Sequence, residues 1–506
     1  MYARRTPIIY RAWIETKLMI KIDDRLKACA DLIDGNGIVC DVGTDHAHLC
    51  VYLIQSGKCS KVIASDIIDG PLKSAKQTVT RYQLEDSISI VKSDGLKNVD
   101  LNGVSDVIIA GMGGENILGI IKDCPKLQED GISLILQPMT KAPLLRKELY
   151  SLGYEIVKEV AVQVNNTFYT IMKVNYTGFS MQLGDFSAKA GKVNFFDDTS
   201  KAYGLHKVSS LRKLVDSLQF SGSDASKLIE VADRVELYAT EKVYTTVQDI
   251  YNVIDTVANF STQERWDNSG LLIGSPTAKV SKVLVSLDIT DEVVNEAKDL
   301  RCELIVSHHP VIFDPLKMVT PNDTVYKLIQ NGIGAICCHT PLDICVGGIN
   351  DILYSIFKTP LGLQDDISPI EDVKGCGLGS GFGRICSTNT TLSCEQIALT
   401  LKKILHCSVV KYVPSDKPIH KVAFCSGSGG SMLEDAILLG ADVFITGDIK
   451  HDRWIYAKDN ALALFDCGHF HTENVVVPYL RQLIFASVPN VEVYVAKSSR
   501  DIVKYV

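Results

Sequence analysis

The sequence has no apolar run approaching the roughly 20 residues that a membrane-spanning helix needs. It also lacks low-complexity tracts and short-period repeats, which excludes repeat arrays. The first 18 residues are basic but contain neither the apolar core nor the cleavage site of a secretory signal, so we expect residues 1–18 to be a disordered extension. A chain of 506 residues without such segments predicts two or three globular domains.

No C-x-x-C pair occurs among the 15 cysteines, and many of them lie in apolar stretches. This pattern excludes a disulfide framework and indicates buried free thiols in a reducing cytoplasm. A large basic field is missing as well, because residues 1–175 carry equal numbers of basic and acidic side chains and the net charge of −8 falls in the remainder. Nucleic acid would have to meet a local patch, for which Lys141, Arg146 and Lys147 are candidates.

Residues 25–175 alternate helical patterns with short apolar runs and end in a hairpin pattern. This predicts an α/β domain with a mainly parallel, Rossmann-like sheet over residues 19–175. Leucine and valine stripes further on predict a helical hairpin and linker over residues 176–245. The runs that we interpret as parallel strands are Ile38–Val42, Lys61–Ser65, Ile88–Val91, Asp106–Ala110 and Ser133–Gln137.

Acidic residues end three successive predicted strands, at Asp41, Asp66 and Asp94. Ligands of open α/β sheets bind beyond the carboxyl ends of the strands, so these carboxylates are expected to share one crevice. There they suit a cationic nucleoside: Asp66 can accept from ribose hydroxyls and Asp94 from an adenine amino group. A nicotinamide cofactor would share the ribose acid, but the G-x-G-x-x-G turn is missing. Each acid alone could equally cap a helix.

The fourth predicted strand ends in Gly111-Met112-Gly113-Gly114. Glycines allow a backbone to approach a flat substrate closely, so we place the substrate side here. The Asn/Asp-Pro-Pro-Tyr motif of many amino-methylating enzymes is absent. The alternative is a tight strand-to-helix turn.

Together, DVGTDHAHL, ASDI, SDGL and AGMGGENI resemble the TrmK-type bacterial tRNA (adenine-N1) methyltransferases over residues 19–240. The resemblance implies S-adenosylmethionine as methyl donor and tRNA as substrate, although a small-molecule substrate is the alternative. Met112 and Gly113 would line the base pocket, and Asp45 or His46 would orient the exocyclic amine, unless His46 is structural. The expected cofactor-binding residues are Asp41, Gly43, Thr44, Asp66, Ile67, Asp94, Gly95 and Gly111.

Most of the 11 histidines lie in the second half, where a new α/β pattern over residues 246–506 predicts a two-lobed domain. Histidines follow three predicted strands, in His308-His309-Pro310, His339-Thr340-Pro341 and Gly468-His469-Phe470. A lone histidine is usually a hydrogen-bonded core residue. Several imidazoles with carboxylates at strand ends indicate Zn, Mn, Fe or Co, and five ligands suit two bridged metal ions better than one.

The motifs WDNSGLLIG, VSLDIT, SHHPVIF, HTPLD, TGDIKH and DCGHFHTE resemble the GTP cyclohydrolase I type 2 homologue family over residues 246–506. This resemblance implies a dinuclear metal site and a homo-oligomer, often a hexamer. A two-metal site would activate water, so we expect a hydrolase of unknown substrate. The alternative is a metal-binding scaffold without catalysis. His339, His451 and His471 fall outside the implied ligand set and would support it. The implied ligands are His308, His309, Asp343, His469 and Glu473.

Overall fold

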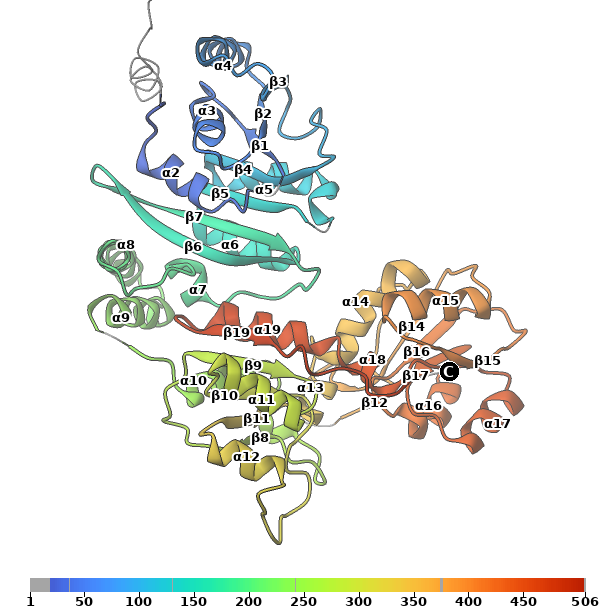
Figure 1. The fold of residues 1–506 in the computed structure, drawn as a ribbon. Helices are drawn as coiled ribbons and strands as arrows, with labels where there is room; N and C mark the ends of the chain where they lie inside the picture. The colour runs from blue at the N-terminus through green and yellow to red at the C-terminus, as the bar shows by residue number, and fades with distance from the viewer. Residues whose placement is uncertain (1–18, 36, 130, 242, 374–375, 505–506) are drawn as a thin grey trace, which may run out of the picture. The chain divides into compact units, whose positions relative to one another are not determined.

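The computed structural model divides into two compact units, Met1–Val243 and Tyr244–Val506 (Figure 1). The predicted extension over residues 1–18 lies outside the described residues. Within the described part of the chain, no helix has the length and apolar character needed to cross a membrane. The structure describes residues 19–35, 37–129, 131–241, 243–373 and 376–504.

The first unit is built on a sheet with the strand order β3-β2-β1-β4-β5-β7-β6. Strands β1 to β5 run parallel, and β7 is antiparallel to both β5 and β6. The predicted α/β class and Rossmann-like sheet are confirmed. The strands are β1 Ile38–Val42, β2 Lys61–Asp66, β3 Ile88–Lys92, β4 Val104–Gly113, β5 Ser133–Thr140, β6 Tyr154–Val164 and β7 Thr167–Tyr176.

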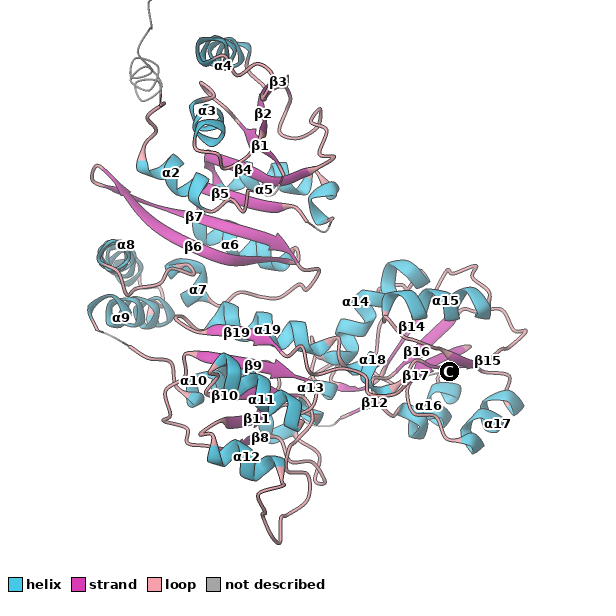
Figure 2. Ribbon diagram, in the orientation of Figure 1, coloured by secondary structure: helices cyan, strands magenta, loops and turns pink. Residues whose placement is uncertain are grey.

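Helices cover both faces of this sheet, α2 to α4 in one layer and α5 with α6 in the other (Figure 2). Parallel strands covered on both sides read as nearly continuous apolar runs, which is why the sequence reveals them. The helices are α2 Asp24–Asp31, α3 His48–Gln55, α4 Asp69–Tyr82, α5 Gly114–Lys122 and α6 Ala142–Ser151.

Three further helices follow the sheet: α7 Asp185–Ala190, α8 Asp198–Phe220 and α9 Ser226–Thr240. The last two form the predicted helical hairpin, and α7 occupies a stretch where the sequence shows no pattern. A buried ion pair ties this region to the sheet. Arg146 on α6 and Glu159 on β6 lie 2.6 Å apart, and Arg146 also donates to the Ala188 carbonyl at 2.7 Å.

The second unit contains two five-stranded sheets within its described residues, ordered β19-β9-β10-β11-β8 and β14-β16-β17-β18-β15. In the first sheet the four neighbours β19-β9-β10-β11 are parallel, and in the second the three neighbours β16-β17-β18 are parallel. The strands are β8 Gly270–Ile273, β9 Lys282–Ser286, β10 Leu304–Ser307, β11 Gly334–Cys337, β14 Arg384–Ser387, β15 Lys411–Val413, β16 Lys421–Phe424, β17 Val443–Thr446, β18 Ala463–Asp466 and β19 Glu492–Val495.

The two sheets define two lobes, as predicted. A short ladder of β12 Glu371–Asp372 with β13 Gly381–Phe382 lies between the two lobes in the chain, before β14. The helices of the second unit are α10 Val247–Asp255, α11 Asp291–Leu300, α12 Thr324–Gln330, α13 Thr340–Ile344, α14 Ile349–Leu361, α15 Cys394–Ile404, α16 Leu433–Leu438, α17 His451–Asp459, α18 His469–Glu473 and α19 Val476–Ser487.

Candidate functional site

Parallel register brings the ends of β1 to β4 to one edge of the first sheet. Asp41 is level with Ala64 of β2 and with Ile108 of β4, and Asp66 is level with the last residue of β3. The turn after β1 is tied to β2, because the N–H groups of Gly43 and Thr44 both donate to the Ser65 carbonyl, at 2.8 and 2.9 Å. The predicted strand-end residues therefore face the same edge.

Asp41 is buried, and its side chain makes a structural contact at the turn after β1. Its Oδ2 accepts from the Cys50 thiol on α3 at 3.2 Å. Burial raises the pKa of Asp41, while hydrogen bonds from Thr44 and Cys50 act in the opposite direction. This carboxyl group thus ties the end of β1 to α3 through a side chain. It does not cap the helix, because α3 begins after Ala47 without a side-chain cap.

Gly43 and Met112 come into contact across the edge. Gly43 has φ of +79°, and a Cβ there would lie 2.1 Å from Cε of Met112. Glycine is therefore needed for the backbone conformation and for the space that the methionine side chain fills. The predicted substrate side, at the end of β4, adjoins the predicted cofactor turn.

The remaining predicted residues of this edge are more exposed. Asp66 accepts from the Ile68 N–H at 2.7 Å, next to the exposed Ile67, and Asp94, just before Gly95, pairs with Lys97 at 2.6 Å. Asp45 and His46 form an exposed pair at 3.3 Å. These side chains are open to a ligand.

The candidate basic patch needs a correction. Arg146 is 1% exposed and its guanidinium is occupied by Glu159, so it cannot meet RNA. Lys141 and Lys147 stay at the surface, where they pair with Glu115 and Asp185. The sequence could not distinguish these residues, because burial depends on the packing of α7 against α6.

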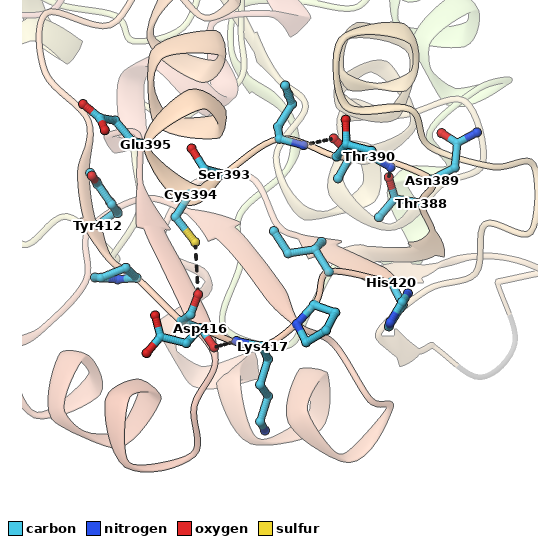
Figure 3. Close-up of a pocket in the computed structure, with 16 residues that line it drawn as sticks. Thr388, Asn389, Thr390, Ser393, Cys394, Glu395, Tyr412, Asp416, Lys417 and His420 are labelled. Atoms are coloured by element: carbon cyan, nitrogen blue, oxygen red, sulfur yellow. Dashed lines mark hydrogen bonds between the residues drawn. The ribbon is translucent and has the colours of Figure 1, made fainter.

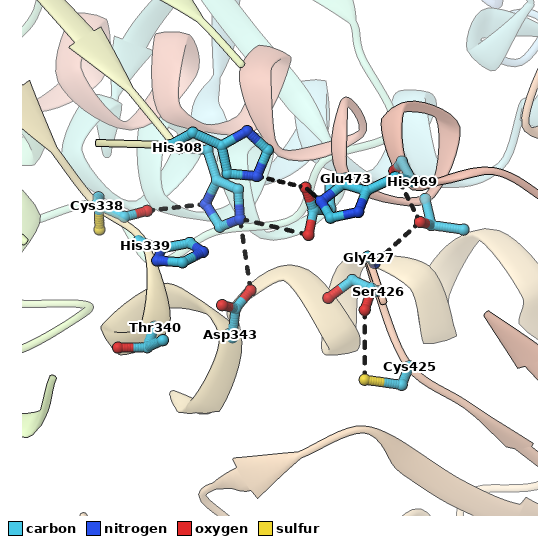
Figure 4. Close-up of polar contacts among 12 residues, drawn as sticks. His308, Cys338, His339, Thr340, Asp343, Cys425, Ser426, Gly427, His469 and Glu473 are labelled. Atoms are coloured by element: carbon cyan, nitrogen blue, oxygen red, sulfur yellow. Dashed lines mark hydrogen bonds and ion pairs between the residues drawn. The ribbon is translucent and has the colours of Figure 1, made fainter. Parts of the chain in front are cut away.

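In the second unit the five expected metal ligands converge (Figure 4). Glu473 Oε2 lies 2.8 Å from His309 Nε2 and 2.9 Å from His469 Nε2. His308 Nε2 lies 3.6 Å from Asp343 Oδ1 and 3.9 Å from Glu473 Oε1. Ligand atoms that lie about 2.1 Å from one metal ion are roughly 3 to 4 Å apart, depending on the angle between them. The separations of 2.8–3.9 Å are therefore close to those of shared coordination.

Both lobes contribute to this centre. His308 and His309 follow β10, and Asp343 lies on α13 after β11, the neighbouring parallel strand. His469 and Glu473 are four apart on α18, which follows β18 of the second sheet. The predicted strand-end histidines of both lobes therefore meet in one cluster.

Each imidazole is oriented by a hydrogen bond at Nδ1. The Nδ1 partners are the Cys338 carbonyl for His308 (2.9 Å), Asp288 for His309 (2.7 Å), Asp448 for His469 (2.9 Å) and Asp267 for His339 (2.8 Å). With Nδ1 occupied, Nε2 is the atom left to coordinate, an arrangement typical of metal-binding histidines. Sequence reasoning missed these acids as supporting groups, although all three stand inside the motifs that carried the resemblance.

His339 also joins the candidate ligands. One potential ligand atom of each of His308, His309 and His339 lies within 4.8 Å of the others. We expected His339 to stand outside the ligand set together with His451 and His471. Only His339 differs from this expectation among these three, because His471 pairs with Asp501 at 3.2 Å and His451 begins α17.

A test of fit comes from buried atoms that lack hydrogen bonds. Among the described residues, His308 Nε2 and Asp343 Oδ1 are buried with no hydrogen-bond partner. Buried polar atoms are almost always paired, and leaving one unpaired costs about 1–3 kcal/mol. A cation between these atoms would satisfy both, and the mixture of imidazole and carboxylate suits Zn, Mn, Fe or Co. The residues therefore fit a metal centre.

Charges around Glu473 hold the cluster together. Burial disfavours an ionised His309, but hydrogen bonds to Asp288 and Glu473 outweigh it and raise the pKa of His309 to about 10. The hydrogen bond to Glu473 raises the pKa of His469 to about 9, against the effect of burial. The cluster therefore has a strong electrostatic demand for positive charge, which a metal ion would meet.

A cavity of about 470 Å³ opens onto the centre, lined by His339, Asp343, Glu473 and Trp266. The loop Ser426–Ser431 forms another part of its wall. The N–H groups of Ser426, Gly427 and Gly429 donate to side chains of the protein, so this loop is a structural turn. A separate cavity of about 690 Å³, lined by the loops around Cys394 and Asp416, contains none of the predicted site residues (Figure 3).

Two family models match the chain. The model described as Duf34/NIF3 (NGG1p interacting factor 3) matches residues 245–502, and the model described as methyltransferase domain matches residues 22–172. The chain is thus a fusion of these two kinds of domain, which confirms the resemblances drawn from the motifs. It belongs to the Duf34/NIF3 family.

Similar proteins cover one half of the chain each. The GTP cyclohydrolase 1 type 2 homolog of Clostridium perfringens is 31% identical over 261 residues, which are 50% of this chain and 97% of that protein. NGG1-interacting factor 3 of Saccharomyces cerevisiae is 33% identical over 41% of this chain and 79% of its own length. The solved structure of the B. subtilis tRNA methyltransferase TrmK covers 43% of this chain and 97% of its own, at 28% identity and a TM-score of 0.35.

Proposed function

We propose that the first unit transfers a methyl group from S-adenosylmethionine to N1 of an adenine in tRNA. The observation that carries the proposal is the shared edge of the sheet, where Asp66 and Asp94 follow β2 and β3 and Met112 contacts Gly43. The motif resemblance to TrmK-type enzymes supports the substrate class. A methyltransferase domain spans this region.

When bound, S-adenosylmethionine supplies an electrophilic methyl group. Asp66 would accept from the ribose hydroxyls and Asp94 from the adenine amino group. Adenine N1 already carries a lone pair, so the protein has to position the base and exclude water rather than remove a proton. N1 lies on the pairing edge, so the target base must be unpaired or turned out of its stack. Met112 and Gly113 would line that pocket, with Asp45 or His46 orienting the amine.

The decisive experiment is transfer of a tritiated methyl group to unmodified tRNA, followed by mapping of the labelled base. N1-methylation blocks base pairing, so reverse transcription should stop at one adenine. Asp66→Ala should lose S-adenosylmethionine binding. Label that appears only in small molecules would mean that the substrate is a small molecule and not tRNA. Label on tRNA without a stop in reverse transcription would exclude N1 as the methylated atom.

We propose that the second unit binds two divalent metal ions and hydrolyses a substrate that enters the 470 Å³ cavity. The observation that carries the proposal is the set of Nε2 atoms turned toward Glu473 and Asp343, with their Nδ1 atoms occupied. The ions would be held by His308, His309, Asp343, His469 and Glu473, with His339 as a further candidate. Metal ions in such a site would lower the pKa of a bound water.

Elemental analysis should find close to two metal ions per chain in the wild-type protein and a clear loss in the His308→Ala, Asp343→Ala double variant. A panel of phosphate esters and amides should reveal hydrolysis that the double variant lacks. Metal without any hydrolysis would favour the scaffold alternative. Equal metal content in the wild-type protein and the double variant would show that these residues do not bind the metal.

We further infer that the second unit self-associates. The loop between β10 and α12 exposes the apolar side chains of Phe313, Leu316, Met318 and Val319. Contiguous exposed apolar side chains mark contact surfaces in proteins. Light scattering should show a homo-oligomer, up to a hexamer, that Leu316→Asp with Met318→Asp reduces in size; a monomeric wild type would contradict this.

We also infer a cytoplasmic location, because the 15 cysteines are free thiols and most are buried. Buried free thiols are typical of reducing compartments. Fractionation of the cells that produce the protein should find it with cytoplasmic markers, and recovery with a membrane or secreted fraction would contradict the location.

A further inference from the structure

The end of β4 has a second side, which faces β5 and α2. Gln137 lies level with Ala110 in the parallel register and is fully buried. Its Oε1 accepts from the Gly111 N–H at 3.0 Å and from Arg25 Nη1 at 2.6 Å. Its Nε2 donates to the Pro138 carbonyl at 3.1 Å, which fixes the orientation of the amide. Gln137 therefore joins Arg25 to the glycine turn at the substrate side.

Arg25 packs directly over this turn. A Cβ on residue 111 would lie 3.4 Å from the Arg25 guanidinium, and Gly111 has φ of +79°. The guanidinium also faces Asp23 at 3.5 Å, and the Arg25 side chain keeps 20% of its surface exposed. A guanidinium has five N–H donors, so a group held by Gln137 and Asp23 keeps donors for a ligand at the mouth of the edge.

The two sides of Met112 differ in chemistry. Its side chain reaches Gly43 on the β1 side, where the cofactor turn lies, whereas Arg25 and Gln137 lie on the β5 side. A cation that donated to adenine N1 would occupy the lone pair that has to attack the methyl group. A nucleotide turned out of its stack presents its phosphate next to the base, and arginine binds phosphate through paired, charge-assisted hydrogen bonds.

We propose that Arg25, held in place by Gln137, binds a backbone phosphate of the tRNA nucleotide that enters the Met112 pocket. The inference rests on the proposed methylation of tRNA. It makes Arg25 a substrate-binding residue on α2, and it assigns to Gln137 a positioning role that acts through Arg25 and through the Gly111 N–H.

The test is kcat/KM for tRNA, measured at saturating S-adenosylmethionine over a series of KCl concentrations. Arg25→Gln should lower kcat/KM roughly 10- to 100-fold, mainly through KM, because a charged hydrogen bond is lost. It should also reduce the slope of log(kcat/KM) against log[KCl] by about one, the effect of removing one phosphate contact. Arg25→Lys should keep the slope, because the cation remains.

Lys27→Gln is the matched control. Lys27 is an exposed cation on the same helix, two residues and therefore about 200° around the axis from Arg25. It should leave both kcat/KM and the salt slope unchanged. Calorimetric binding of S-adenosylmethionine should be the same in all variants, which shows that the cofactor side is intact.

Failure of the proposed tRNA methylation and failure of the proposed role of Arg25 give different results. A wild-type protein that methylates no tRNA overturns the proposed function and this inference with it. If the wild type is active and its Arg25→Gln variant keeps the full salt slope, the inference alone is overturned. Arg25 would then only support the structure of the turn at Gly111. An equal loss of slope in Lys27→Gln would also overturn it, since the effect would be one of total charge.

Discussion

Carboxylates that accept from Nδ1 hold three histidines of the candidate metal centre in orientation. Asp288 accepts from His309 Nδ1 at 2.7 Å and is itself half-exposed, so its removal leaves the ligand in place but free to turn. Asp288→Ala should therefore weaken metal binding by about 10- to 100-fold, the usual effect of losing such a partner. Competitive titration with a chromophoric chelator measures it.

The control for this prediction is Asp291→Ala. Asp291 lies three residues further on and pairs with Lys327 at 2.5 Å, away from the histidines. Its loss should leave metal affinity unchanged. If the two variants bind metal equally well, the orienting role of Asp288 is wrong.

Gly43 is required for two separable reasons, backbone conformation and space. Gly43→Ala should destabilise the first unit by about 1–3 kcal/mol from backbone strain and also displace Met112, with loss of S-adenosylmethionine binding. Gly57 provides the comparison, because its φ is +69° and a Cβ there would meet nothing within 4 Å. Gly57→Ala should show the strain without the loss of binding, as measured by urea unfolding and calorimetry.

If Gly57→Ala abolished binding as well, contact with Met112 would not be the cause. A second check is Gly43→Ala combined with Met112→Ala. Removal of the methionine side chain relieves the 2.1 Å approach but not the positive φ. Binding should therefore recover in part while the strain persists.

At the scale of elements, the ion pair of Arg146 and Glu159 joins α6 and β6 to α7. Both side chains are almost completely buried, at 1% and 0% exposure. Breaking a buried pair leaves an uncompensated charge, so Arg146→Ala should lower the free energy of unfolding of the first unit by about 3–5 kcal/mol. Urea unfolding followed by circular dichroism measures this.

Lys147 next to it offers a matched surface pair. It binds Asp185 at 2.5 Å with side chains 48% and 44% exposed. Exposed pairs contribute about 0–1 kcal/mol, so Lys147→Ala should change stability little. A similar cost for the two variants would mean that burial does not decide the strength of these contacts.

At the scale of the whole molecule, the chain consists of two compact units, and the candidate metal ligands all lie in the second. A ligand that binds only the folded state stabilises the unit that holds it. Chelation should therefore lower the temperature of one of two thermal transitions and leave the other unchanged. Scanning calorimetry with and without chelator checks this.

The His308→Ala, Asp343→Ala variant should show one transition already lowered and no further response to chelator. A shift of both transitions in the wild-type protein would show that the units unfold together. Added S-adenosylmethionine should raise the temperature of the other transition, that of the first unit.

Much of the fold follows from the sequence because its strands are parallel and buried. Such strands appear as apolar runs of five or so residues that end in aspartate, glycine or histidine, and β1, β2 and β10 were found in this way. Strands β8 and β15 were not predicted, because they are antiparallel edge strands that are only partly buried and so lack a continuous apolar run of that length. The metal motif was found for the same reason, since its residues stand at strand ends.

The sequence by itself determined the two domain types, the edges at which their sites form and the residue types that face them, because strand ends and motif spacing are local properties. Only the tertiary structure decided which neighbours those residues have. Arg25 meets Gly111 across 86 positions, Asp267 meets His339 across 72, and Arg146 turns inward while Lys147 does not. Such pairings depend on how helices and sheets pack, and no local pattern encodes them.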